Sequence, residues 1–166
     1  ENLGLRPANE YEFRVFVSPV GPYYKSAGLA VISLAVSDYD RTAPNGTGAF
    51  KAGANYAGGL LATKKANELG ANEALYLDSA KRTYIDEAGS ANIIVTMKGN
   101  RFVTPKSNAI LPSVTRRSIM TLAEQHLNMQ VEDRPIDLRK EIGDFEEVVA
   151  CGTAAVLTPV GKIWLD

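Results

Sequence analysis

Short stretches in which hydrophobic residues alternate with polar ones, or run together, recur along the whole chain. Tyr11 to Val20 alternates and is rich in Phe and Val, which predicts a strand that ends at the turn Pro19–Pro22. Leu29 to Ser37 is mostly apolar and predicts a second strand, buried on both faces. Further strands are predicted at Glu73–Asp78, Thr83–Glu87, Asn92–Met97, Arg101–Thr104, Val148–Cys151, Ala155–Val160 and Ile163–Leu165, with a hairpin turn at Lys98-Gly99-Asn100 and an extended stretch at Val131–Pro135.

Two longer stretches have the spacing or composition of helices. Ala57 to Leu69 is predicted to be helical up to Gly70, and Val114 to Leu127 is predicted to be an amphipathic helix. A short helix is expected at Leu138–Ile142, with Asp137 as its cap. The residues expected to face inward are Ala57, Leu60 and Leu61 in the first helix and Ile119, Leu122, Ala123 and Leu127 in the second. Many short strands with only two substantial helices predict an α+β fold and not a doubly wound sheet.

Composition narrows the class of protein. A chain of 166 residues with 45% hydrophobic and 22% charged residues has the size and composition of one globular domain. The net charge of -1 gives no electrostatic reason to expect nucleic acid or an anionic membrane as a partner. One histidine and one cysteine cannot form a zinc site of the usual kind, so we expect no metal. The single Cys151 excludes an internal disulfide, which fits a reducing compartment such as the cytoplasm.

One lysine stands out because small residues surround it. Lys51 is the only charged residue between Arg41 and Lys64, and Ala, Phe and Gly flank it. Such neighbours would partly desolvate the amine and favour its neutral form, which can form an imine with an aldehyde. Taken alone, the same stretch also fits a surface lysine in a flexible glycine loop.

Four other places could contribute to a site with this lysine. Glu87 ends a predicted strand and could pair with a protonated ring nitrogen, or it could be a solvated acid. Thr115 lies at the start of the predicted amphipathic helix, where free N–H groups can bind an anion or simply be capped. Thr153 could add a second phosphate contact or belong to a tight turn. Tyr56 could donate its hydroxyl to a ring bound at Lys51, or pack as an ordinary aromatic residue.

These motifs occur together in an order that resembles that of a known family, the branched-chain amino acid aminotransferases. These are fold-type IV enzymes that use pyridoxal phosphate. The motifs that carry the resemblance are Phe16-Val17-Ser18-Pro19-Val20-Gly21, Gly46-x-Gly48-x-x-Lys51-x-Gly53-x-Asn55-Tyr56, Tyr84-Ile85-Asp86-Glu87-x-Gly89-x-x-Asn92, Leu111-Pro112-x-Val114-Thr115-Arg116 and Gly152-Thr153-Ala154-x-x-x-x-Pro159-Val160. The resemblance implies a large domain built as a pseudo-barrel of mixed strands flanked by helices. This sequence departs from the usual family pattern at Ala54 and Ser113, positions where glycine is more common in the family.

The resemblance also implies a role for individual residues. Lys51 would hold pyridoxal 5'-phosphate covalently and shuttle the α-proton of the substrate, while Glu87 would contact the pyridine nitrogen. Tyr56 would bond the phenolic oxygen of the ring. The residues that would hold the phosphate are Val114, Thr115 and Thr153. Ser90 and Ala154 would lie beside the carboxylate of the substrate. Arg41 matches an arginine of the family near the cofactor.

The function implied is transamination of leucine, isoleucine and valine with 2-oxoglutarate by a longer homodimeric enzyme. Residues 1–10 would be an interdomain linker and 11–166 a cofactor-binding domain that is clipped at its C-terminal end and lacks the family's small N-terminal domain. The fragment alone would bind the cofactor weakly and turn over little substrate. Three alternatives stay open: D-amino acid transamination, aminodeoxychorismate cleavage, and a non-catalytic domain fragment.

Overall fold

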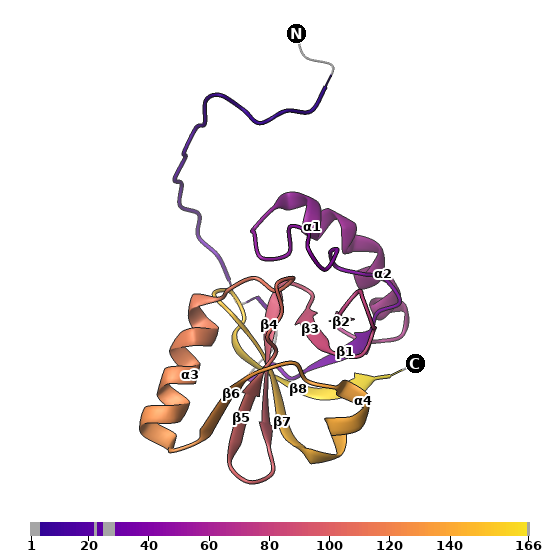
Figure 1. The fold of residues 1–166 in the computed structure, drawn as a ribbon, viewed down its shortest axis with the longest axis vertical. Helices are drawn as coiled ribbons and strands as arrows, with labels where there is room; N and C mark the ends of the chain where they lie inside the picture. Colours follow the sequence, from indigo (N-terminus) through magenta and orange to yellow (C-terminus); the bar gives the residue numbers. More distant parts are fainter. Residues whose placement is uncertain (1–3, 22, 25–28, 166) are drawn as a thin grey trace.

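Eight strands form one mixed sheet that closes on itself in the computed structural model, which describes residues 4–21, 23–24 and 29–165. The strand order is β3-β2-β1-β8-β7-β4-β5-β6, and an additional pairing of β3 with β4 closes six of the strands into a ring (Figure 1). The strands are β1 (Ile32–Val36), β2 (Glu73–Leu77), β3 (Ile85–Ala88), β4 (Ala91–Met97), β5 (Arg101–Thr104), β6 (Gln130–Asp133), β7 (Phe145–Gly152) and β8 (Val156–Trp164).

Strand directions bring three chain segments to one end of this sheet. Strands β3, β5 and β7 all run antiparallel to their common neighbour β4. Their carboxyl ends therefore lie at the end of the sheet where β4 begins. The segments that follow them are the β3–β4 turn, the loop that leads into α3, and the β7–β8 turn (Figure 1). Side chains from distant parts of the sequence can meet there.

The helices cover the sheet from two sides. Helices α1 (Gly53–Gly58) and α2 (Leu60–Glu68) lie above β1 and β2, while α3 (Val114–Leu127) lies along the opposite flank (Figure 1). The helical elements are completed by α4 (Leu138–Glu141) and a 3-10 turn, η1 (Ile142–Asp144). Within the described part of the chain, no helix has both the length and the apolar character that a membrane crossing requires.

Local sequence signals explain where the helices begin and end. Ser113 caps α3 through its side chain, which accepts the N–H of Arg116, and Asn128 ends that helix in the left-handed conformation with φ of 52°. Asp137 caps α4 in the same way by accepting the N–H of Lys140. Both the bounds of α3 and the cap of α4 agree with the sequence predictions.

Three groups of buried side chains hold the sheet and helices together. The largest fills the ring, with Ile93 and Val95 of β4 pointing into it. Ile94, between them in sequence, lies in a separate group under α3 together with Ala123 and Cys151. This alternation follows from the two-residue period of a strand. A third group, rich in alanine, joins α2 to the sheet through Ala35, Ala62, Ala66, Ala71, Ala74 and Tyr76.

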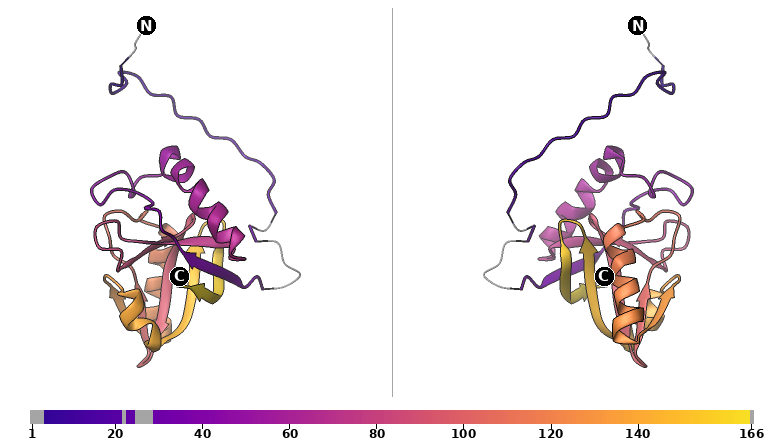
Figure 2. Two further views of the ribbon diagram at one scale, coloured as in Figure 1. Left: turned by 90° about the vertical axis from the view of Figure 1, so that its right-hand side faces the viewer. Right: turned by 90° about the vertical axis from the view of Figure 1, so that its left-hand side faces the viewer.

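The predicted N-terminal strand is wrong. Residues 11–20 form no strand, and Phe13 is 91% exposed. A strand needs a neighbour for its backbone hydrogen bonds, and no described strand pairs with this segment. The segment extends away from the barrel in both views of Figure 2. The predicted turn at Pro19–Pro22 includes position 22, which lies outside the described residues.

The predicted inward faces of the helices also need correction. Ala57 and Leu61 are exposed, and Leu60 is 70% exposed, whereas Ala62 and Ala66 are the buried residues of α2. In α3, Ala123 is buried as predicted, but Leu122 and Leu127 are exposed. The single predicted helix at Ala57–Leu69 is two helices that meet at Gly59, and the last two predicted strands form the one strand β8.

Candidate functional site

The centre of the candidate site is the carboxylate of Glu87, which β3 carries into the interior. Its side chain is only 2% exposed. One oxygen, Oε1, accepts the side-chain N–H of Asn92 at 2.9 Å and the backbone N–H of Leu111 at 2.6 Å. The other, Oε2, lies 3.0 Å from Nε of Arg41. Three donors from three separate segments therefore hold one buried acid in place.

The same surroundings act on the ionisation of Glu87 in opposite directions. Burial raises its pKa to about 7, while the Arg41 guanidinium, the Leu111 N–H and the charge of Lys51 pull it down. The neighbouring carboxylate of Asp86 raises it further. Burial also raises the pKa of Asp86, to about 6. Glu87 is thus not the solvated strand-end acid that the sequence left open as an alternative.

Arg41 connects Glu87 to the two neighbouring loops. Its side chain is 4% exposed, and its Nη1 donates to the carbonyl of Ala109 at 2.7 Å and to that of Gly48 at 3.4 Å. The guanidinium thus spans the loop after β1, the loop before α3, and Glu87. Its Nη2 is buried without a hydrogen-bond partner among the described residues. The structure thus places Arg41 against Glu87. Its Nε and Nη1 bind groups of the protein itself, so they are not available to a ligand.

Asn55 fixes the loop that carries Lys51. Its buried side chain donates to the carbonyls of Thr47 at 2.8 Å and Phe50 at 2.9 Å, and its Oδ1 accepts the Thr47 hydroxyl at 2.6 Å. Backbone groups in a loop without secondary structure need such partners to stay in one conformation. Asn55 is part of the Gly46–Tyr56 motif, but the sequence alone predicted no role for it.

Lys51 itself is exposed, so the expectation of a desolvated amine is wrong for this chain. Phe50, which was expected to help bury it, is 67% exposed. The ammonium Nζ lies 3.5 Å from the hydroxyl of Tyr56 and 5.3 Å from the centre of its ring. Lys51 nevertheless remains close enough to Glu87 to lower the pKa of that acid. Their contact residues, Tyr56 for the amine and Arg41 for the acid, line one cavity, which keeps both groups in the same candidate site.

Strand register adds Cys151 to the row of side chains that begins at Glu87. Glu87 pairs with Asn92 across β3 and β4, and Asn92 pairs with Cys151 across β4 and β7. Paired residues of neighbouring strands point to the same face. Cys151 is fully buried and burial raises its pKa to about 12, which fits a packed residue and not a reactive thiol.

The residues proposed for phosphate binding lie at the end of the sheet where the carboxyl ends of β3, β5 and β7 gather. Val114 and Thr115 are the first two residues of α3, and Thr153 lies in the β7–β8 turn. Val114 and Thr153 are exposed, and Thr115 is partly buried. The structure brings these segments together at that end of the sheet.

Ser90 and Ala154 lie beside two hollows that share Tyr23. The hydroxyl groups of Ser90 and Tyr23 lie 3.0 Å apart, and Ser90 lines a cavity of about 240 Å³ together with Arg41 and Tyr56. Ala154 lines another cavity of about 250 Å³. Sequence reasoning missed Tyr23, for which the only available signal was its place directly after the motif that ends at Gly21.

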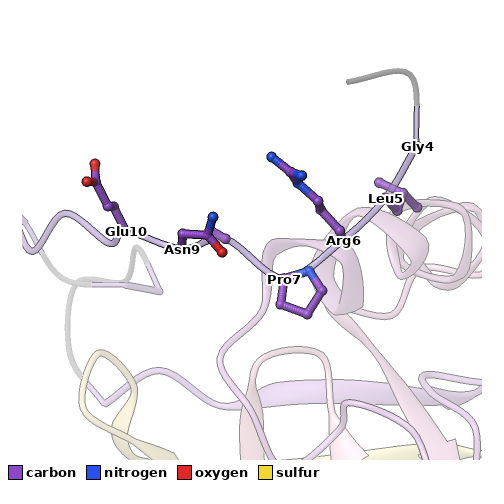
Figure 3. A pocket seen from close by; sticks show the side chains of 7 residues that line it. Gly4, Leu5, Arg6, Pro7, Asn9 and Glu10 are labelled. Atoms are coloured by element: carbon purple, nitrogen blue, oxygen red, sulfur yellow. The ribbon is translucent and has the colours of Figure 1, made fainter. Parts of the chain in front are cut away.

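A further hollow lies far from this site. It is lined only by consecutive residues, Gly4 to Glu10, of the extended N-terminal segment (Figure 3). All seven are exposed. No group of three His, Cys, Asp or Glu residues that could hold a metal ion occurs in the described part of the chain.

The chain is similar to aminotransferases over almost its whole length. A family model described as amino-transferase class IV matches residues 2–163. The branched-chain-amino-acid aminotransferase of Helicobacter pylori is 48% identical over 167 residues, covering 98% of this chain and 48% of that protein. That of Haemophilus influenzae is 45% identical over 168 residues, with the same shares. The chain thus spans about half the length of the curated relatives it matches.

Solved structures of the same kind share the fold. The branched-chain amino acid aminotransferase of Escherichia coli superposes with a TM-score of 0.78 at 34% identity, covering 88% of this chain and 47% of that one. The enzyme of Thermobaculum terrenum, solved in its PLP form, gives a TM-score of 0.71 at 28% identity, covering 80% and 43%. The predicted α+β class and the fold-type IV pseudo-barrel are confirmed.

Proposed function

Because this chain belongs to the class IV aminotransferase family, we propose that it is the cofactor-binding part of a branched-chain amino acid aminotransferase. The reaction would transfer the amino group of leucine, isoleucine or valine to 2-oxoglutarate. The relatives at 45–48% identity, which carry that enzyme name, support this substrate class. In this proposal residues 1–10 are a linker, residues 11–166 form the cofactor domain, and the enzyme works as a cytoplasmic homodimer.

Pyridoxal 5'-phosphate is the cofactor that we propose, and the residues present fit it. The observation that carries the proposal is Glu87, a buried carboxylate held by Arg41, Asn92 and Leu111. Its Oε2 has one protein contact, which leaves it able to accept a hydrogen bond from a protonated ring nitrogen. At an effective dielectric near 20, such a pair is worth roughly 4 kcal/mol at about 4 Å, enough to favour the charged ring.

A phosphate group has a matching place at the start of α3. Backbone N–H groups in the first turn of a helix have no intrahelical acceptor and favour anions. The Ser113 side chain accepts the backbone N–H of Arg116. The backbone N–H groups of Val114 and Thr115 therefore remain for a ligand. No acidic residue lies in the first turn, so nothing there repels a phosphate. Thr153 would add its hydroxyl from the β7–β8 turn.

The bound cofactor would supply an electron-withdrawing ring that stabilises negative charge developing at Cα of an amino acid. Lys51 would supply the primary amine that attaches the cofactor, and its Nζ, when neutral, would take and return the α-proton. Tyr56, whose hydroxyl lies 3.5 Å from that Nζ, would orient the amine and donate its hydroxyl to the phenolic oxygen of the ring. Glu87, kept in place by Arg41, would preserve the positive charge on the ring nitrogen.

A substrate panel tests the reaction. The full-length parent enzyme and this 166-residue chain would each be assayed with L-leucine, D-alanine and aminodeoxychorismate in the presence of pyridoxal phosphate and 2-oxoglutarate. We expect the parent to prefer L-leucine strongly, and the chain alone to turn over little because its lysine is exposed. A preference of the parent for D-alanine or aminodeoxychorismate would contradict the proposed substrate, and no turnover of any of the three would indicate a non-catalytic protein.

A further inference from the structure

Two loops meet at an unusually close contact next to the buried acid. One follows β1 and carries Lys51, and the other leads into α3. At their contact, a Cβ atom built on the buried Gly48 would lie 2.0 Å from the carbonyl oxygen of Ala109 and 2.6 Å from its carbonyl carbon. A real Cβ atom cannot approach backbone atoms so closely, so this approach requires glycine. The requirement is one of space, since Gly48 is not among the glycines with a positive φ.

This contact sets the position of two groups that act on Glu87. Arg41 Nη1 reaches the carbonyls of both loops, at Gly48 and Ala109, while its Nε contacts Glu87. Two residues after Ala109, the N–H of Leu111 donates to Glu87 at 2.6 Å. Moving the Ala109 backbone would therefore disturb the seat of the guanidinium and also the N–H that binds the carboxylate.

Ser107 secures the second loop from within. Its Oγ accepts the backbone N–H of Ala109 at 3.0 Å. The loop is thus held at one point by its own serine and at another by the contact with Gly48. Loss of either should loosen the same stretch, with the larger effect at Gly48 because a side chain there would push the loop outward.

We propose that Gly48 is a positioning residue for the buried acid of the site. It admits the Ala109 carbonyl to the guanidinium of Arg41 and so keeps both Arg41 and the Leu111 N–H on Glu87. Ser107 assists from the other side of the same loop. The importance of this arrangement for a cofactor rests on the proposed function, but the arrangement itself belongs to the chain without any cofactor.

The titration of Glu87 in the cofactor-free chain measures the effect. Its neighbours of opposite charge are Arg41 and Lys51, and Asp86 and the thiol of Cys151 are its acidic neighbours. With Arg41 and Leu111 displaced in Gly48→Ala, burial is less opposed, so the pKa of Glu87 should rise. We expect an increase of about one unit, a tenfold change in the ionisation constant. Carbon-13 NMR of labelled glutamate carboxyl groups records it, with Glu87→Gln identifying the signal.

Two further variants make the test decisive. Gly58→Ala is the matched control, because a Cβ at that exposed glycine meets nothing within 4 Å, and its Glu87 titration should equal that of the unsubstituted chain. Ser107→Ala should raise the pKa of Glu87 by a smaller amount than Gly48→Ala, and the Asp86 titration is recorded with it because Ser107 also lowers the pKa of Asp86 through a hydrogen bond. If Gly48→Ala does not fold, as judged by circular dichroism, Ser107→Ala tests the same step, namely whether loosening the Ala109 backbone shifts the Glu87 titration, and no shift there overturns the proposal.

A second readout links the arrangement to the proposed function. The dissociation constant for pyridoxal phosphate, measured by absorbance, should increase about tenfold in Gly48→Ala if the displaced acid no longer faces the ring, in line with a loss of about 1.4 kcal/mol. An unchanged Glu87 titration in folded Gly48→Ala and Ser107→Ala would overturn the positioning role. A shifted titration in a chain that does not bind the cofactor would support the positioning role and contradict the proposed function.

Discussion

The two halves of the candidate site differ in how completely this chain builds them. Glu87 is buried on β3, and its three donors come from strand β4 and two loops. Lys51 is exposed, and within the described part of the chain its side chain hydrogen-bonds only to Tyr56, at 3.5 Å. The surroundings of the acid are thus complete within the folded chain, whereas the amine lies on a fixed loop and stays exposed to solvent. Folding of this chain is therefore enough to bury and pair the carboxylate of Glu87, but not to desolvate the amine of Lys51.

The largest effect on stability should come from breaking the acid half. Arg41→Met leaves the buried Glu87 without its cation, and breaking one side of a buried ion pair typically costs about 3–5 kcal/mol. Lys51→Met, the matched change in the open half, should alter the free energy of unfolding by less than about 0.5 kcal/mol because the side chain is exposed. Urea unfolding at pH 8 measures both, and equal effects would erase the contrast between the halves.

The effect of Arg41→Met should shrink in acid. Below the pKa of Glu87, the carboxyl group is neutral in the folded state and no longer needs the guanidinium. The difference in unfolding free energy between the variant and the unsubstituted chain should therefore be smaller at pH 5 than at pH 8. A constant difference across this range would show that Glu87 does not titrate with its raised pKa.

Asp86 should give the next largest effect, of about 2–3 kcal/mol at pH 7 and above. Burial raises its pKa from 3.8 to about 6, so between these values the folded chain binds more protons than the unfolded chain. This acid therefore lowers the free energy of unfolding as pH rises through that window. Asp86→Asn removes the contribution, so the variant should gain stability relative to the unsubstituted chain between pH 4 and 6. Urea unfolding across that range is the measurement, and parallel pH profiles would refute the assignment.

Asn55 should contribute roughly 2 kcal/mol, since its amide group satisfies two loop carbonyls. Asn55→Ala removes both donors and should also speed limited proteolysis between residues 46 and 52. Asn67→Ala is the control, because that exposed amide donates only to a carbonyl of its own helix at Thr63. Cleavage at the same rate in the two variants would mean that Asn55 does not fix the Lys51 loop.

The smallest effect concerns α2. Leu60→Ser should change the free energy of unfolding by less than about 0.5 kcal/mol, because Leu60 is 70% exposed. Ala62→Leu should instead cost about 1–3 kcal/mol, because it overfills the alanine-rich contact with the sheet. Thermal unfolding of the two variants distinguishes the observed face of α2 from the one predicted from its leucines.

Local patterns predicted most of the elements, and long-range contacts explain the exceptions. The bounds of α3 and the β4–β5 hairpin follow from periodicity, a serine cap and a glycine turn within the segment itself. Residues 11–20 have the alternation of a strand, but alternation does not supply a neighbouring strand with which to pair. The face of α2 was misread because small residues at Ala35 and Ala74 bring the sheet close, so that alanines fit where leucines would not.

The sequence motifs pointed to the candidate residues but not to their contacts. Lys51 and Glu87 were both named from motifs, and only the folded chain shows that Glu87 is buried and Lys51 exposed. The ion pair between Arg41 and Glu87 joins positions 46 residues apart in sequence, and no local spacing signals it. The burial of Lys51 was inferred from its small neighbours, yet desolvation depends on what covers a loop and not on the size of the adjacent residues.

The most direct test of the account is to locate the covalently attached cofactor. The chain would be incubated with pyridoxal phosphate, reduced with borohydride, digested and analysed by mass spectrometry, alongside Lys51→Ala and the control Lys64→Ala, an exposed lysine of α2. The account predicts one modified peptide, which contains Lys51, present in the Lys64→Ala variant and absent from the Lys51→Ala variant. Modification spread equally over surface lysines, or retained without Lys51, would contradict it.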